Sequence, residues 1–342
     1  MEPMIEEAEL TRTTSSTDPM SAPGDAAPPK KVSTRGKSPT AIALARLRRD
    51  RVAMTCAVIF LFFLLIAIFA PLLVKLEGQD TTTLHQDLID QYGFPTIGIT
   101  SDHWFGIEPR LGRDLFARWV YGARPSLIVA ISVTIVTTII GVIIGLIAGF
   151  VGGWTDRILS WIIDFVLSLP YLLFAIAVPA VLLAMFVGTA EGASAEDTAR
   201  VRFISLILVL SFFGWASLAR LIRGEVLSLR EREFISAAKV LGVPTRKVLF
   251  RELLPNLVAP IVISTSMALP SYIVTEAGLT LLGVGLTEPT PSWGLTIAAA
   301  ETYYRADPLY LWLPVLAITV LVLALSLLGD SVRDAFDPRT RR

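Results

Sequence analysis

The chain has 342 residues, of which 53% are hydrophobic, and its formal net charge at pH 7 is zero. An apolar chain whose charges gather at its ends and in one loop is typical of an integral membrane protein and not of a soluble globular domain. The single cysteine, Cys56, lies in an apolar run, which excludes a disulfide framework and a thiolate metal site, and only two histidines make a histidine-rich metal site unexpected.

The first 50 residues differ in composition from the apolar remainder of the chain. Residues 1–37 are rich in Ser, Thr, Pro and Ala, cannot bury enough apolar surface to offset chain entropy, and are expected to be disordered. A basic run follows, and such runs stay in the cytoplasm: Arg46, Arg48, Arg49 and Arg51. A signal peptide is disfavoured, because the next apolar run is long enough to span and no small-residue cleavage site follows it. We therefore predict a mostly disordered cytoplasmic tail over 1–50 and a transmembrane domain over 51–342.

Six apolar runs of about twenty residues or more predict membrane-spanning helices. They lie at about 52–74, 126–150, 158–187, 203–222, 257–282 and 309–328. Six crossings return the chain to its starting side, and the density of Lys and Arg assigns that side, with both termini, to the cytoplasm. One basic cluster disagrees with this assignment, because it lies in a loop that the predicted topology places outside: Arg110, Arg113, Arg118 and Arg124. The assignment is kept, because the same loop also carries many acids. The predicted fold is an all-α membrane protein with six transmembrane helices.

Small residues and prolines mark particular positions in these spans. Gly141, Gly145 and Gly149 recur every four residues, which lets another helix approach the backbone closely, and packing within this chain is favoured over a subunit interface. Prolines in the third and fifth spans permit kinks: Pro170, Pro179, Pro260 and Pro270.

A charged stretch interrupts the apolar pattern at about 230–256. Four apolar residues in it fall at helical spacing and form one stripe: Phe234, Ala237, Ala238 and Leu241. Gly242 then predicts a helix end with positive φ, and Pro244 predicts the start of a second short helix over 243–254. The expected product is a helix-turn-helix on a hydrophilic loop between two spans.

Two carboxylates lie inside the predicted spans, where they are costly and usually face a partner or a water-filled path. Asp164 is expected to form a structural ion pair with Arg220 or Arg223. Glu276 is a candidate for the lining of a translocation path, and a capped or paired structural acid is an equal alternative.

The charged stretch resembles the cytoplasmic coupling loop of ABC-importer permeases. That motif has two alanines, a glycine four residues later and a leucine-proline pair, which here are Ala237, Ala238, Gly242, Leu254 and Pro255. The acid that usually precedes the alanines is replaced by Ser236, with Glu233 three positions earlier. The resemblance implies that residues of the loop contact an ATPase: Glu233, Phe234, Ala237, Ala238, Leu241, Gly242, Leu254 and Pro255. An amphipathic loop lying on the membrane surface is the alternative.

Further motifs resemble the oligopeptide/dipeptide/nickel permease family, and the end of the chain resembles its second, dipeptide-type permease subunit. They are ordered as in that family: His103 to Gly106, Leu111 to Leu127, Gly152 to Arg157, Leu281 to Gly285, Pro289 to Gly294, and Leu328 to Pro338. The chain departs from the pattern at Ile107 to Arg110, where the family usually has Thr-Asp-Glu, and in a polar insertion from Glu191 to Arg200.

The resemblance implies a type I ABC importer permease in the bacterial cell membrane. Expected partners are a second homologous permease, two ATP-binding cassette subunits, an extracytoplasmic substrate-binding protein and a peptide substrate, with the lipid bilayer as surroundings and no nucleic acid. The sequence has no Gly-x-x-x-x-Gly-Lys-Ser/Thr phosphate loop and no catalytic or metal-binding constellation in a span. We therefore expect a non-catalytic subunit without cofactors of its own, whose partner subunits bind ATP and Mg.

Three alternatives stay open from the sequence. A nickel-chelate permease of the same family would share every motif. An ion-coupled secondary transporter would use Asp164 and Glu276, but it would not need the charged loop, and no inverted repeat of broken helices is evident. An intramembrane enzyme is weaker, because no paired set of catalytic groups is present.

Overall fold

A computed structural model describes residues 39–187 and 194–337. The disorder predicted for 1–37 and the first part of the insertion at 191–200 lie outside these residues. Among the described residues, five helices are long and apolar enough to cross a membrane, and a bent pair of helices meets the same criterion when the two are taken together. This is the all-α membrane fold that the sequence predicted.

The six passes extend beyond most of the predicted spans. They are α2 (Arg51–Glu77), α3 (Leu115–Val151), the pair α4 (Gly153–Ser168) and α5 (Tyr171–Phe186), α6 (Ala195–Arg230), α9 (Leu254–Leu281) and α11 (Pro308–Phe336). The shorter elements are α1 (Pro39–Leu47), η1 (Gln86–Leu88), α7 (Glu233–Val240), α8 (Thr245–Lys247), η2 (Val248–Leu253) and α10 (Trp293–Ala300). From Ala195 onward, the predicted polar insertion therefore forms the first turn and a half of α6.

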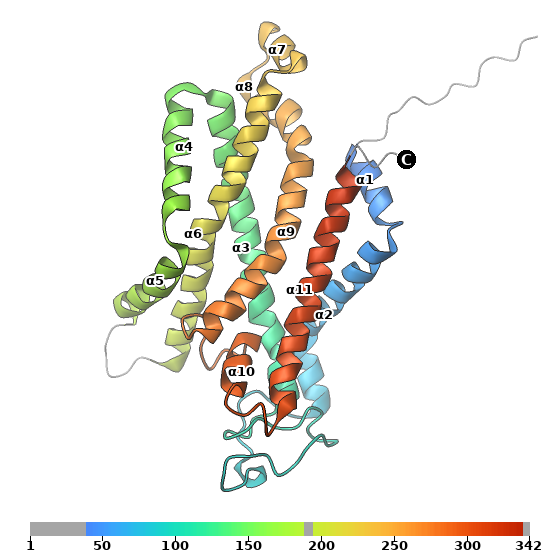
Figure 1. Ribbon diagram of the computed structural model, residues 1–342, viewed down its shortest axis with the longest axis vertical. Helices are drawn as coiled ribbons and strands as arrows, with labels where there is room; N and C mark the ends of the chain where they lie inside the picture. Colours follow the sequence, from blue (N-terminus) through green and yellow to red (C-terminus); the bar gives the residue numbers. More distant parts are fainter. Residues whose placement is uncertain (1–38, 188–193, 338–342) are drawn as a thin grey trace, which may run out of the picture. The chain divides into compact units, whose positions relative to one another are not determined.

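Both ends of the described chain lie at one end of the helix bundle (Figure 1). We call this the α7 end, since α1, α7 and the last turns of α11 lie there, and we call the opposite end, with residues 78–114 and α10, the α10 end. The Arg46 guanidinium of α1 donates to the carbonyl oxygens of Ala335 and Asp337 at 3.4 and 3.3 Å. The helix α1 thus lies within the tail predicted over 1–50, and it is held there because it packs on α11.

The third predicted span, 158–187, is not one straight helix. It is replaced by α4 and α5, which meet at a bend of 86°. The break falls at Leu169 and Pro170, which have ψ of 137° and 95°. A proline disfavours helical geometry in the residue before it and has no N–H to continue the ladder, so the helix ends there.

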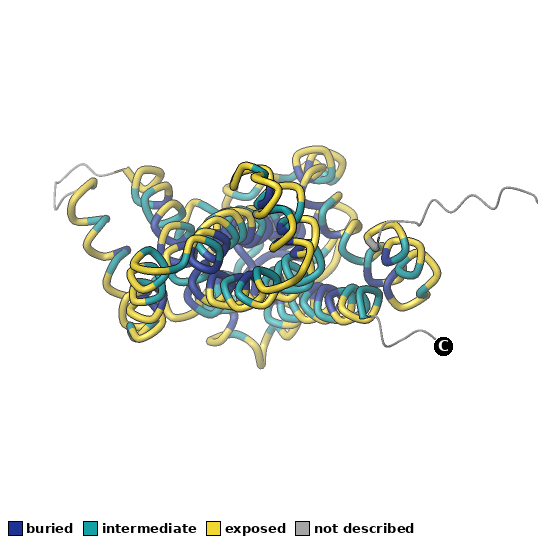
Figure 2. The backbone as a smooth tube through the Cα atoms, turned by 90° about the horizontal axis from the view of Figure 1, so that it is seen from above, coloured by how far each residue is buried: buried dark blue, intermediate teal, exposed yellow. Residues whose placement is uncertain are grey.

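The most extensive helix packing joins α3 to α6, and buried residues gather in the middle of the bundle when it is viewed from the α7 end (Figure 2). A Cβ atom on Gly145 would come 2.6 Å from the Ala219 carbonyl oxygen. Gly141 and Gly149 face α6 in the same way, at 2.9 Å from the Trp215 oxygen and 2.7 Å from the Val226 Cβ. The three glycines therefore lie in a contact within this chain, where only a residue without a side chain fits.

We predict that Gly145→Ala lowers the thermal stability of the purified protein, because the added methyl group must push α3 and α6 apart at a cost of about 1–3 kcal/mol. The matched control is Gly224→Ala, on exposed α6 surface with nothing within 4 Å of the added Cβ. That change should be neutral or stabilise by up to about 1 kcal/mol. Equal melting temperatures for the two variants in detergent would contradict the packing.

Candidate functional site

The charged loop forms the α7 end of the bundle, and its first helix ends as the sequence predicted. Gly242 has φ of 69°, and the Val243 N–H donates to the Ala238 carbonyl oxygen at 3.0 Å. This six-to-one hydrogen bond around a left-handed glycine is the Schellman ending of a helix. A Cβ atom added to Gly242 would have no other atom within 4 Å, so there is room for a side chain. Glycine is favoured at this position by its positive φ angle.

The second short helix predicted over 243–254 is not a separate element. From Thr245 to Leu281 the chain is one continuous helical pass, made of α8, η2 and α9. Its segment η2 is a π-helix, in which the Leu254 N–H reaches the carbonyl oxygen of Leu249. The widened turn lies directly before Pro255, whose ring and missing N–H conflict with a regular turn. The loop is therefore a short helix joined by a tight turn to the start of a long spanning helix.

One residue that the sequence analysis did not single out anchors α7. Ile235 is fully buried in a cluster with Val226 of α6 and with residues near the start of the continuous helix Thr245–Leu281: Val248, Leu253 and Leu257. The predicted stripe points elsewhere, since the side chains of Phe234 and Leu241 are 42% and 81% exposed. Ala237 and Glu233 are also exposed, whereas Ala238 is half-buried against the cluster. The stripe is thus a free apolar surface on a helix that is held from its other side.

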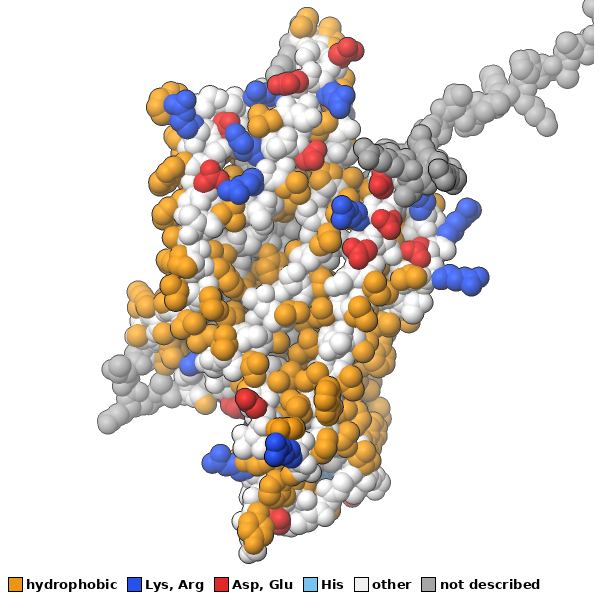
Figure 3. Space-filling view, in the orientation of Figure 1, with side chains coloured by type: hydrophobic (Ala, Val, Ile, Leu, Met, Phe, Trp, Pro, Cys, Tyr) orange, Lys and Arg blue, Asp and Glu red, His pale blue; other side chains and the backbone are white. Residues whose placement is uncertain are grey.

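Ion pairs join the neighbouring helices at the same end, where charged side chains of both signs gather (Figure 3). The pair expected for Asp164 is present, with its Oδ1 atom 2.5 Å from the Arg220 Nη2 atom. Arg223 binds both carboxylate oxygens of Asp156, at 2.5 and 2.9 Å. Arg230 donates to the Gly149 carbonyl oxygen at 3.2 Å. The C-terminal part of α6, which leads into α7, is therefore bound by these contacts to both α3 and α4.

Glu276 lies in the interior of the bundle and not on a surface. Its carboxylate accepts hydrogen bonds from the Ser126 hydroxyl of α3 at 2.7 Å and from the Thr280 hydroxyl at 3.0 Å. Thr280 in turn accepts from the Leu286 N–H at 3.1 Å. This geometry is that of the structural acid considered as the alternative. A place for Glu276 on a translocation path stays a prediction and would need another conformation to expose it.

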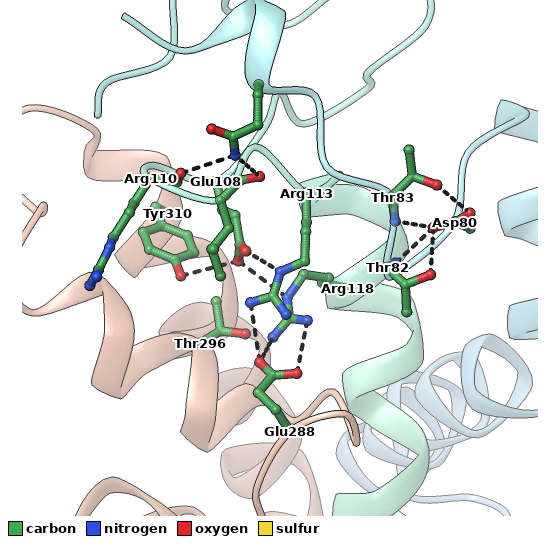
Figure 4. Close-up of polar contacts among 12 residues, drawn as sticks. Asp80, Thr82, Thr83, Glu108, Arg110, Arg113, Arg118, Glu288, Thr296 and Tyr310 are labelled. Carbon is green, nitrogen blue, oxygen red and sulfur yellow. Dashed lines mark hydrogen bonds and ion pairs between the residues drawn. The ribbon is translucent and has the colours of Figure 1, made fainter. Parts of the chain in front are cut away.

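A second polar cluster lies at the α10 end, where the loop at 78–114, whose basic residues disagreed with the predicted topology, meets residues of other elements (Figure 4). Glu108 is 1% exposed, forms an ion pair with Arg113, and lies 3.2 Å from both the Arg118 Nε atom and the Tyr310 hydroxyl. Glu288 binds the same two arginines, at 3.1 Å from Arg113 and 2.7 Å from Arg118. Two of the four outer arginines are therefore neutralised by carboxylates.

The electrostatics of this outer cluster follow from its pairing. Burial alone would raise the pKa of the Glu288 carboxyl, but the charges and hydrogen bonds of Arg118 and Arg113 outweigh it and lower that pKa overall. Glu108 belongs to the segment in which the chain departs from the family pattern. That departure was the one signal in the sequence that could have marked the cluster. Among the described residues, no group of three or more His, Cys, Asp or Glu side chains is placed to hold a metal ion.

One further acid lies on a helix that contains a predicted span. The last span was predicted over 309–328, and its helix α11 continues to Phe336 and includes Asp330. Asp330 therefore lies on the same helix, two residues beyond the predicted end of the span.

Comparison with known proteins matches most of the chain. Residues 141–342 match the family described as binding-protein-dependent transport system inner membrane component, and residues 38–88 match the N-terminal transmembrane domain of oligopeptide transport permease C. The dipeptide transport system permease protein DppC of Alkalihalophilus pseudofirmus is 34% identical over 94% of this chain and 97% of its own. The oligopeptide transport system permease protein OppC of Bacillus subtilis is 33% identical over 93% and 95%. The glutathione transport system permease protein GsiD of Shigella flexneri is 36% identical over 86% and 89%.

We predict that Arg118→Met destabilises the protein, because it leaves the buried Glu108 carboxylate with one arginine fewer and weakens the pairing of Glu288. Removing one partner of a buried pair costs about 3–5 kcal/mol. Arg110→Met is the matched control, since the exposed Arg110 side chain has no ion pair among the described residues, and it should change stability by less than about 0.5 kcal/mol. Denaturant unfolding in detergent measures both, and a similar small loss for the two variants would contradict the role of the cluster.

Proposed function

This chain belongs to the family of binding-protein-dependent transport system inner membrane components, and we propose that it is one of two permease subunits of an ATP-driven importer of short peptides. Membership makes it a permease component of an ABC importer. The peptide substrate is favoured over a nickel chelate because the relatives named above are permeases for dipeptides, oligopeptides and glutathione. Uptake of a labelled dipeptide, set against uptake of radioactive nickel, distinguishes the two.

The observation that carries the mechanism is the exposed apolar stripe on α7. An apolar surface held out from the bundle by a buried anchor suits a contact with another protein. We assign that contact to an ATP-binding subunit, because this chain has no phosphate-binding loop and its transport would need ATP and Mg bound elsewhere. The second permease and the extracytoplasmic binding protein complete the proposed importer.

The proposed coupling passes through the contact of Ile235 with the buried cluster that holds α7. A force on α7 acts on Ile235 and so on the buried cluster that includes α6 and the start of the continuous helix Thr245–Leu281. Because α6 is tied to α3 and α4 by its arginines, these helices would move as a unit and open the path to one side or the other.

We predict that the α7 end is cytoplasmic, with both termini. In a Cys56→Ala background, Val240→Cys and Tyr92→Cys place thiols on side chains that are 88% and 74% exposed at opposite ends of the bundle. A membrane-impermeant maleimide should label residue 92 from outside right-side-out vesicles, and residue 240 only after permeabilisation. Labelling in the opposite order would invert the topology.

We further predict that changes in the loop uncouple transport. Gly242→Val forces a β-branched residue to positive φ, at a cost of about 1–3 kcal/mol, and Ala237→Asp places a charge on the stripe. Uptake by the reconstituted importer should fall at least about tenfold, an amount that 1.4 kcal/mol of lost coupling produces. The binding protein should keep its affinity for peptide.

Both changes have matched controls. Gly78→Val imposes the same strain on the ending of α2, where the glycine has φ of 89° and open space around it. Ala45→Asp adds the same charge to an exposed position of α1. The controls should transport near the wild-type rate. If Gly242→Val and Ala237→Asp also assemble and transport normally, the loop is not the coupling element.

A further inference from the structure

A groove between α9 and α11 has a chemical character that the coupling mechanism does not use. Its walls are largely apolar, from Met267 to Val274 on one side and Val322 on the other. Its polar atoms belong to three hydroxyl side chains and one carboxylate: Ser271, Thr275, Ser326 and Asp330. Figure 1 shows α9 and α11 side by side, and residues of both helices line the groove.

The groove presents hydrogen-bond acceptors. The Ser271 hydroxyl donates to the Met267 carbonyl oxygen at 3.3 Å, and the Thr275 hydroxyl donates to the Ser271 carbonyl oxygen at 2.8 Å. A hydroxyl that gives its hydrogen to its own helix keeps only lone pairs for other groups. Together with the Asp330 carboxylate, these oxygens favour a cationic donor over an anion.

Asp330 is held at the groove and is unpaired among the described residues. A Cβ on the preceding Gly329 would meet the Ser266 carbonyl oxygen at 3.5 Å, so α11 contacts the backbone of α9 at this level. Asp330 itself is exposed, and none of the ion pairs of the described residues includes it. An unpaired carboxylate on a spanning helix is stable only where water or a cation reaches it.

Two further hollows adjoin α9, and they lack such a charge. One is lined by hydroxyl side chains from α3, α6 and α9: Thr137, Thr138, Ser217, Ser264, Thr265 and Tyr272. The other, near the α4–α5 bend, is mainly apolar. Among the described residues that line the three hollows, Asp330 alone is charged.

We propose that Asp330 binds the positively charged ammonium groups of the peptide during its passage, both the α-ammonium and those of lysine side chains, with the lone pairs of Ser271 and Thr275 completing the acceptor set. The inference rests on the proposed peptide import. It assigns the α9–α11 groove to the translocation path and gives that path a preference for peptides with positive charge. An ammonium has three donors and no acceptor, which matches a site built of acceptors.

The test compares uptake of dilysine, dialanine and diglutamate by the complete importer in proteoliposomes. Asp330→Asn removes the charge and keeps the shape, Asp330→Glu restores the charge, and Asp334→Asn makes the same change one turn further on, beside α1. For Asp330→Asn, we expect uptake of dilysine to fall by about tenfold or more, dialanine less, and diglutamate least, because charge attraction scales with the charge of the peptide. Asp330→Glu and Asp334→Asn should keep the wild-type ratios among the three peptides.

The outcomes separate the inference from the proposed function. Equal losses for the three peptides would show that Asp330 pairs with a partner subunit, and unchanged uptake would show that it does not meet the substrate. Either result overturns the inference and leaves peptide import standing. A wild-type importer that takes up none of the three peptides overturns the peptide assignment and this inference with it.

Discussion

The close approach of α3 and α6 determines where the other functional parts lie. Three glycines of α3 allow the backbones to meet, so these two long helices form one unit from the α7 end to the level of the bend between α4 and α5. α6 continues into α7 and thus presents the proposed coupling surface. α3 begins at Asp114, whose carboxylate caps the helix at 2.7 Å from the Ala117 N–H, next to the outer ion-pair cluster. Separation of these helices would therefore displace both sites together.

Polar groups in this apolar bundle fall into two classes, and the distinction separates structure from function. Asp156, Asp164 and Glu108 lie within reach of arginines, and Glu276 is held by hydroxyls. Such pairing lowers the cost of a charge in a membrane, so these side chains fix helix positions. Asp330 and the stripe on α7 lack partners among the described residues, and a polar or apolar surface left free in this way is the one available to another molecule.

Much of this arrangement could be predicted from the sequence, since it depends on local rules. Apolar length marked the candidate passes, the spacing of glycine marked the close-packing face of α3 without naming its partner, and Gly242 located the turn after α7. The remainder depended on contacts between distant residues. The buried anchor Ile235 sits beside Phe234 in the sequence but about 100° away around the helix, and only the cluster of α6 and η2 decides which one is covered. Likewise, Glu288 is far from Arg118 along the chain, so its pairing could not be read from a motif.

The sequence allowed a kink at Pro170, and the structure has a sharp bend there that divides one run into two helices. The prediction of a separate second helix in the charged loop was wrong, because Pro255 ends no helix and a π-helical segment precedes it. The second case has a mechanical consequence. Since the chain from Thr245 to Leu281 is continuous, the element that begins beside α7 also forms one wall of the groove that contains Asp330. A displacement of α7 that tilts this helix relative to α11 would change the separation between Ser271 and Asp330, so one continuous helical element joins the coupling surface to the proposed ammonium site.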